Sequence, residues 1–382
     1  MIASVLLLGA SWSAVASSSA MASNSGAVEQ WAQWEIALEA PTHTLANPFT
    51  SVELMVELHA PGGAVDQNAV VRGFYDGLVT TMVAADTADS ASVGVWRARF
   101  MPPVVGTWTW LTHCSTGVLN NKSGAFTVVP PSSASNHGPV RTHGTTFRYA
   151  DGKPFHVVGT TVYGLSGGVW GSNKLTPNKT AETLATLARS PFNKVRMMAF
   201  PTDGRSSAPT WLPYEMSSSH SNQTDPTRFN LPFWQRLDRT IGSLLELGIQ
   251  ADIILFNLYS PPWPIGLSCL GGSTPETYNI SNDRLFLRYM VARIASFRNV
   301  WWSMSNEWNQ CSCKFTAPDP DHAEAAKPVG WPPAAATPAW DTPIWDELFR
   351  IVRATFVCVL CMVVICQLLS HFSYNVHAVG SC

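Results

Sequence analysis

The chain has 382 residues, which is enough for two domains with a sizeable core. Its formal net charge of −2 and its 13% of charged residues leave no basic surface of the kind that binds nucleic acid and no acidic tail of the kind that buffers cations. The 8 cysteines are unevenly placed and do not form a spaced disulfide framework.

The N-terminus has the pattern of a secretory signal peptide. Residues 2–10 form an apolar run that is too short to span a bilayer, and small residues follow it at positions that suit cleavage. Asn-X-Ser/Thr triplets begin at Asn121, Asn178, Asn222 and Asn279, which agrees with export and glycosylation. We therefore predict a signal peptide over residues 1–22 and a secreted glycoprotein.

Residues 28–130 predict an all-β domain. Apolar residues alternate at period two in several short runs, and a turn sequence stands at residues 61–63. The expected strands lie at 34–38, 52–58, 70–75, 95–100, 107–112 and 125–129. Short strands at regular spacing indicate an immunoglobulin-like β-sandwich, which would serve either as a structural spacer or as a sugar-binding module.

A linker and an α/β region follow. Residues 131–146 begin with a stretch rich in Pro and Ser, and residues 147–353 then alternate between strand and helix patterns. Strands are expected at 155–161, 194–200, 249–256 and 300–304, and helices at 181–189, 233–247, 283–297 (with Asn282 as N-cap) and 344–353. Four successive strand-helix units make about half of a closed barrel, so we predict a partial (β/α)8 TIM barrel after the β-sandwich.

The fourth predicted strand of this region ends in the most informative residues of the chain. Apolar residues run into Asn306 and Glu307, and catalytic groups of α/β barrels gather at the carboxyl ends of strands. A glutamate in that place suits general acid/base cleavage of a glycosidic bond, and the asparagine suits holding a sugar hydroxyl. The alternative is a solvated or salt-bridged glutamate in a loop. We take Glu307 as the candidate catalytic residue.

Further candidates lie on other strands and loops. Arg196 falls within an apolar strand, where it either orients a catalytic carboxylate or forms a structural ion pair. Tyr163, Trp263 and Trp308 follow predicted strands, where their rings either stack on sugars or pack in the core. The sequence has no Gly-rich phosphate loop, serine elbow or metal-ligand motif, so no cofactor and no metal is expected.

The last part of the chain, residues 354–382, has two interpretations. It carries no Lys, Arg, Asp or Glu, and residues 354–369 are almost continuously apolar. This run is either a short membrane anchor at the cell surface or a non-native continuation that replaces the rest of the barrel. We favour the second interpretation, because the run is at the lower length limit for spanning a bilayer.

Several segments together resemble the apiosidase-like glycoside hydrolases, which belong to a larger clan of retaining TIM-barrel hydrolases. They are residues 147–155 and 159–163 at the entry to the barrel, 195–201 at its second strand and 302–307 at its fourth. Residues 96–108 resemble a β-sandwich of uncharacterised function that often precedes such barrels. The resemblance extends over residues 28–353.

The resemblance implies a role for each matching residue. Glu307 would be the acid/base, Asn306 would bind the hydroxyl beside the reacting carbon, and Arg196 would support the nucleophile. The family's nucleophile is a glutamate on a seventh strand, and no acid after Glu307 follows a predicted strand. The chain is thus expected to be a glycoside hydrolase acting on a polysaccharide or oligosaccharide, truncated and inactive in this form. A non-catalytic carbohydrate-binding or membrane-anchored surface protein is the rival hypothesis.

Overall fold

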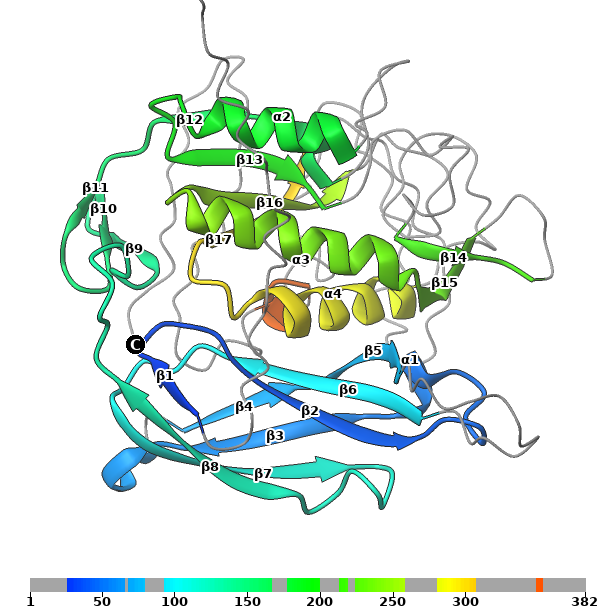
Figure 1. The fold of residues 1–382 in the computed structure, drawn as a ribbon. Helices are drawn as coiled ribbons and strands as arrows, with labels where there is room; N and C mark the ends of the chain where they lie inside the picture. The colour runs from blue at the N-terminus through cyan, green and yellow to red at the C-terminus, as the bar shows by residue number, and fades with distance from the viewer. Residues whose placement is uncertain are drawn as a thin grey trace, which may run out of the picture.

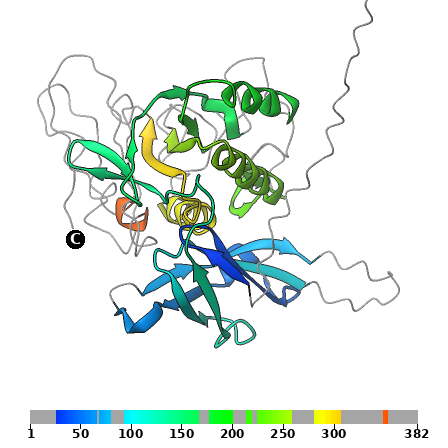
Figure 2. The same ribbon diagram turned by 60° about the vertical axis from the view of Figure 1, so that its left-hand side comes forward.

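The computed structural model describes residues 26–65, 68–79, 93–166, 177–199, 213–218, 224–257, 280–306 and 348–352. Two parts lie one upon the other, and Figures 1 and 2 show this stacking from two directions. The N-terminal part consists of strands and short helical turns, and the C-terminal part combines a parallel sheet with helices. The predicted signal peptide and the apolar tail after residue 353 lie outside the described residues.

The N-terminal part, here called the N-terminal β-sandwich, consists of two sheets of order β1-β8-β7-β3-β4 and β2-β6-β5. Its elements are β1 (Ala27–Glu29), β2 (Trp34–Pro41), α1 (Pro48–Ser51), β3 (Leu54–His59), η1 (Pro61–Gly63), β4 (Ala69–Arg72), β5 (Phe74–Leu78), β6 (Val93–Phe100), β7 (Gly106–Cys114) and β8 (Ser123–Val129). Alternate residues of β3 and β6 are buried, as expected for strands with one face in a core. The core contains residues of both sheets, and the ring of Trp34 stacks on that of Phe126 with centroids 4.3 Å apart.

The predicted strand at residues 70–75 is wrong, because the chain crosses there from one sheet to the other. Residues before the crossing belong to β4 and those after it to β5. Gly73 stands at the crossing, where its N–H donates to the carbonyl of Leu54 at 2.8 Å. A Cβ on Gly73 would lie 2.5 Å from Leu54 Cδ2, so the crossing requires a residue without a side chain.

A small antiparallel sheet, here called the meander, connects the two parts. It consists of β9 (Val140–His143), β10 (Thr146–Tyr149) and β11 (Pro154–Phe155). Val140 and Phe155 pack against Trp301 of the C-terminal sheet, and Figure 2 shows the meander beside that sheet. The predicted linker therefore contains a strand.

The predicted buried strand at 155–161 is also wrong. It is replaced by β11 and by β12 (Gly159–Thr161), and Val157 and Val158 between them are 42% and 43% exposed. The run is apolar enough to suggest a buried strand, but among the described strands β12 pairs with β13 alone and lies at the edge of its sheet.

The C-terminal part is built on a parallel sheet of order β12-β13-β16-β17, in which spatial order follows chain order. The strands after β12 are β13 (Lys194–Met198), β16 (Gln250–Asn257) and β17 (Val300–Asn306). Helices α2 (Pro177–Leu187), α3 (Leu231–Glu246) and α4 (Ile280–Ile294) pack on one face of the sheet. Parallel neighbours joined by helices on one face are successive βα units.

The remaining described elements are short. The turn η3 (Tyr163–Ser166) follows β12, and a hairpin of β14 (Tyr214–Met216) and β15 (Thr224–Phe229) precedes α3. Residues 348–352 are helical, within the predicted helix at 344–353. In the parts of the chain that the structure describes, no helix is both long and apolar enough to cross a membrane.

Helices α2, α3 and α4 all begin earlier than predicted, and α3 does so by two residues. Helix α2 begins at Pro177 rather than at 181, since the fixed φ of proline suits the first turn of a helix. Helix α4 begins at Ile280, so Asn282 is not its N-cap. Asn282 lies in the first turn of α4 instead, and its 9% exposure shows that it is buried there.

Candidate active site

Two of the predicted site residues meet across the parallel sheet. Arg196 lies on β13 and Asn306 is the last residue of β17, with β16 between the two strands. The guanidinium Nη2 of Arg196 donates to the side-chain Oδ1 of Asn306 at 3.3 Å. The predicted ion pair of Arg196 with a carboxylate is thus not what the described residues show, and its contact is with an amide oxygen.

The contact fixes how Asn306 can act on a ligand. A guanidinium only donates hydrogen bonds, so the side-chain atom that faces Arg196 must be the amide oxygen of Asn306. This orientation leaves the amide nitrogen as a donor for a sugar hydroxyl. Asn306 is 5% exposed, and every residue of β17 is buried, so the amide is held by a rigid strand.

Arg196 has spare capacity to bind a further acceptor. Its Nε is buried and has no hydrogen-bond partner among the described residues. An unpartnered buried donor is costly, and such donors are typical of sites that take up a ligand or a charged group. The geometry therefore allows Arg196 to hold Asn306 with Nη2 and a second acceptor with Nε.

A layer of polar side chains lies on the face of the sheet that carries Arg196, and the register places Asp252 of this layer level with Arg196. Ser303 Oγ donates to Asp252 Oδ1 at 2.6 Å, and Lys194 forms an ion pair with the other oxygen of Asp252. The Lys194 ammonium also lies 5.0 Å from the centroid of the Trp301 ring. The side chain of Asp252 is 4% exposed and both of its oxygens are engaged, so it is a structural carboxylate rather than a candidate nucleophile.

The sequence contained a signal for this layer that was missed. Lys194 and Arg196 are two residues apart on one strand and therefore point to the same face. The face opposite the helices is thus polar, although each strand taken alone is apolar enough to suggest burial on both sides. Pairing Lys194 with Asp252 and Ser303 requires the register of three strands, which the sequence alone does not give.

Of the other predicted site residues, the structure describes only Tyr163. Tyr163 is half-buried in η3, directly after β12 and hence at the same edge of the sheet as Asn306. Glu307, Trp263 and Trp308 lie outside the described residues. Glu307 is the next residue after Asn306 in the chain, so the described part of the site ends one residue before it.

Two family models match the chain. A domain of unknown function (DUF5060) matches residues 27–115, which fall within the N-terminal β-sandwich. A model described as an apiosidase-like catalytic domain matches residues 141–354, which contain the meander, the parallel sheet and the Arg196–Asn306 contact. No curated protein sequence matches the chain.

Solved structures of glycoside hydrolases are similar to the chain. A candidate glycoside hydrolase from Bacteroides vulgatus aligns with a TM-score of 0.61 and 30% identity, over 86% of this chain and 54% of that one. A family 5 glycoside hydrolase from Bacteroides vulgatus aligns with a TM-score of 0.35 and 15% identity, over 58% and 37% of the two chains. An endo-1,4-β-mannanase from Rhizomucor miehei aligns with a TM-score of 0.36 and 16% identity, over 57% of each.

The two kinds of match cover different shares of the proteins compared. The chain spans about half the length of the first of these relatives, so they do not transfer a whole enzyme's activity to it. The apiosidase-like model, by contrast, matches more than half of the chain and includes the strands that hold Arg196 and Asn306. The chain belongs to the apiosidase-like catalytic domain family of glycoside hydrolases.

Proposed function

We propose that this chain carries a site for hydrolysis of glycosidic bonds of a polysaccharide or oligosaccharide, with Glu307 as general acid/base and without a cofactor, and that in this form, without the family's second carboxylate, it retains only residual turnover. The observation that carries the proposal is the contact of Arg196 on β13 with Asn306, the last residue of β17, which immediately precedes Glu307 in the chain. We extend the proposal to the fold and infer that the four described parallel strands are the first four of a (β/α)8 barrel.

Glu307 is assigned two proton transfers: it donates a proton to the leaving sugar and later accepts one from water. Its carboxyl gives a proton to the glycosidic oxygen while the bond from that oxygen to the anomeric carbon breaks, so the leaving sugar departs as a neutral alcohol. A second carboxylate, which the family resemblance places on a seventh strand, would bond to the anomeric carbon in the same step. The resulting carboxylate of Glu307 then takes a proton from the water that displaces this second carboxylate. One water is consumed for each bond broken, and Glu307 returns to its protonated state.

Asn306 and Arg196 assist this step without exchanging protons. The amide nitrogen of Asn306 donates to the sugar hydroxyl beside the reacting carbon, a type of hydrogen bond that strengthens in the transition state. Arg196 holds the amide in this orientation through its 3.3 Å contact with Oδ1. Tyr163, Trp263 and Trp308 are proposed to stack on neighbouring sugar rings, since flat apolar faces suit such contacts.

The substrate and the location are proposed from the family model and from the sequence patterns. The description of the family model makes apiose-containing plant glycans the first substrates to test. The signal-peptide pattern of residues 1–22 and the glycosylation triplets support secretion, with the cell surface as the alternative if residues 354–369 act as an anchor.

The test is release of new reducing ends from a panel of plant polysaccharides that includes apiose-containing pectin. Glu307→Gln keeps the size of the side chain but cannot give up a proton, so we expect kcat/KM to fall by about 10²- to 10⁴-fold. Glu246→Gln, at the exposed end of α3, is the matched control and should retain the wild-type rate. Equal turnover in the two variants excludes Glu307 as the acid/base. Sugar binding without turnover in all three proteins supports the carbohydrate-binding rival.

A further inference from the structure

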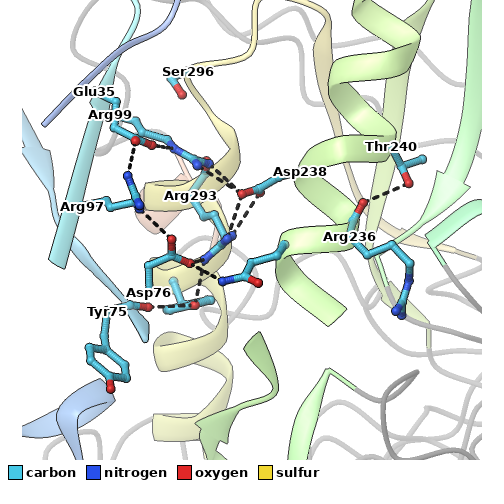
Figure 3. Close-up of polar contacts among 12 residues, drawn as sticks. Glu35, Tyr75, Asp76, Arg97, Arg99, Arg236, Asp238, Thr240, Arg293 and Ser296 are labelled. Atoms are coloured by element: carbon cyan, nitrogen blue, oxygen red, sulfur yellow. Dashed lines mark hydrogen bonds and ion pairs between the residues drawn. The ribbon is translucent and has the colours of Figure 1, made fainter. Parts of the chain in front are cut away.

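A closed ring of six alternating charges joins the N-terminal β-sandwich to the helices of the C-terminal part. Each arginine contacts the acids on both sides of it, so every positive group lies between two negative ones (Figure 3). In order around the ring the residues are Glu35, Arg97, Asp76, Arg293, Asp238 and Arg99. Four of these residues come from β2, β5 and β6 of the β-sandwich, and two come from α3 and α4.

Arg293 is the most deeply buried member of the ring. Its side chain is 1% exposed, and it donates to Asp238 Oδ1 and Oδ2 at 3.0 and 2.8 Å and to Asp76 Oδ1 at 2.7 Å. Burying a charge without a partner destabilises the folded state far more than an ordinary surface ion pair stabilises it. Because Asp76 belongs to the β-sandwich, helix α4 has its full counter-charge only while the two parts are docked.

Arg99 of the β-sandwich also caps the C-terminal end of α4 in the other part. Its Nη1 donates to the backbone carbonyl of Arg293 at 2.7 Å. Arg293 is the last residue but one of α4, where the carbonyls have no N–H partner within the helix. The positive guanidinium is also favourable at this end of the helix dipole. A side chain from one domain thus supplies the C-terminal cap of a helix in the other.

Further contacts between the two parts accompany the charge ring. The ring of Phe74 on β5 is close to both guanidinium groups, with its centroid 5.1 Å from Arg99 Cζ and 5.0 Å from Arg293 Cζ. Phe74 is 3% exposed and belongs to the main core of the C-terminal part rather than to that of the β-sandwich. The hydroxyl of Tyr289 on α4 donates to the carbonyl of Tyr75 at 3.1 Å.

The capped end of α4 leads directly to the candidate site. Only residues 295–299 separate α4 from β17, whose last residue is Asn306. Within this connection Ser296 accepts from Gln33 of the β-sandwich at 2.5 Å. Asn299 donates to the carbonyls of Ile241 and Ile249, which join it to α3 and to the start of β16. The β-sandwich therefore contacts the segment that sets where β17 begins.

We propose that the N-terminal β-sandwich is an intramolecular positioning domain, which caps α4 and closes the charge ring around Arg293 and so fixes β17 and Asn306. This gives a function to a domain of unknown function that differs from a spacer or a separate sugar-binding module. The role depends on contacts between Arg99 and α4 and is independent of whether Glu307 is catalytic.

The first test is hydrogen exchange of the full chain, followed by mass spectrometry of peptides that cover residues 294–306. Arg99→Met removes the cap and one charge but keeps much of the side-chain volume, so we expect amides in this segment to exchange about tenfold faster or more. Arg72→Met is the matched control, because Arg72 pairs with Glu53 within the β-sandwich and away from the ring. Faster exchange confined to the β-sandwich, or none in either variant, overturns the proposal.

A second measurement serves if Arg99→Met does not fold. A protease recognition sequence inserted after Ala134, in the exposed stretch 132–135, allows the folded wild-type chain to be cut between the β-sandwich and the meander. We expect the two pieces to co-elute on size exclusion at micromolar concentration and to unfold in a single transition. Separation of the pieces, or two independent transitions, contradicts a positioning role.

Discussion

At the scale of single residues, the contact of Arg196 with Asn306 gives the two side chains different roles at the candidate site. Arg196 faces the amide oxygen, and Asn306 keeps its nitrogen for the ligand. If Arg196 acts only by orienting Asn306, the effects of removing each residue should not add.

We expect Arg196→Met and Asn306→Ala each to lower kcat/KM by about 10²-fold, the usual cost of losing one hydrogen-bond donor to a transition state. The kcat/KM of the double variant should be only a little lower than that of the less active single variant. Arg189→Met, at an exposed position after α2, is the control. Additive losses in the double variant would show that Arg196 also acts on the substrate through its free Nε.

The sequence predicted these two residues because each carries a local signal. Asn306 ends an apolar run, and Arg196 is a charge inside one. The neighbouring layer of Lys194, Asp252 and Ser303 carries a local signal in the charge of Asp252 within an apolar run, but which residues pair across the layer follows only from the register of three strands. Local pattern therefore identified the site but not the polar layer beside it.

At the scale of secondary structure elements, Trp301 links the meander to the parallel sheet. Its ring lies 5.2 Å from that of Phe147 and 6.0 Å from that of Phe155, and its Nε1 donates to Gln250 at 3.0 Å. The residue is 5% exposed although it lies on the polar face of β17.

We expect Trp301→Ala to lower the free energy of unfolding by about 3–5 kcal/mol, since it removes a large buried ring from between two elements. Trp301→Phe keeps most of the ring and loses one hydrogen bond, so it should cost about 1 kcal/mol. Urea denaturation of the two variants beside the wild type measures both values. An unchanged midpoint for Trp301→Ala would mean that the meander is not anchored through this residue.

Pattern in the sequence identified the regular elements better than the irregular ones. Apolar runs predicted β13, β16 and β17 within a few residues, because β16 and β17 are buried and the half-buried charges of β13 alternate with buried apolar residues. The meander was missed because its strands are short and its apolar residues pack on Trp301, more than 140 positions away from them. The crossing at Gly73 was missed because the residues on both sides of it suit a strand.

At the scale of the whole molecule, the charge ring makes the docking of the two parts sensitive to acid. Burial raises the pKa of Asp76, but the charges and hydrogen bonds of Arg293 and Arg97 outweigh this, so its pKa is lower than the ordinary value of 3.8. A carboxyl with a lowered pKa in the folded state stabilises that state above its ordinary pKa. This contribution is lost as pH falls through the lower, folded-state value.

We expect the thermal stability of the full chain to decline below about pH 4, as Asp76 becomes protonated. Asp76→Asn should be less stable than the wild type near neutral pH, and the difference should shrink as the pH falls below about 4. Glu39→Gln, at an exposed position of β2, should follow the wild-type curve. Parallel curves for Asp76→Asn and the wild type across the whole range would refute the role given to Asp76.

The unequal division of the charge ring limits how this chain can exchange parts with its relatives. Four of its charges are encoded before residue 100 and two after residue 237, so recombination between the two modules separates Arg99 from Asp238 and Asp76 from Arg293. A graft that brings an incompatible residue to either side leaves an arginine in the interior without its counter-ion. Chimaeras should therefore be cut so that β2, β5 and β6 travel with α3 and α4.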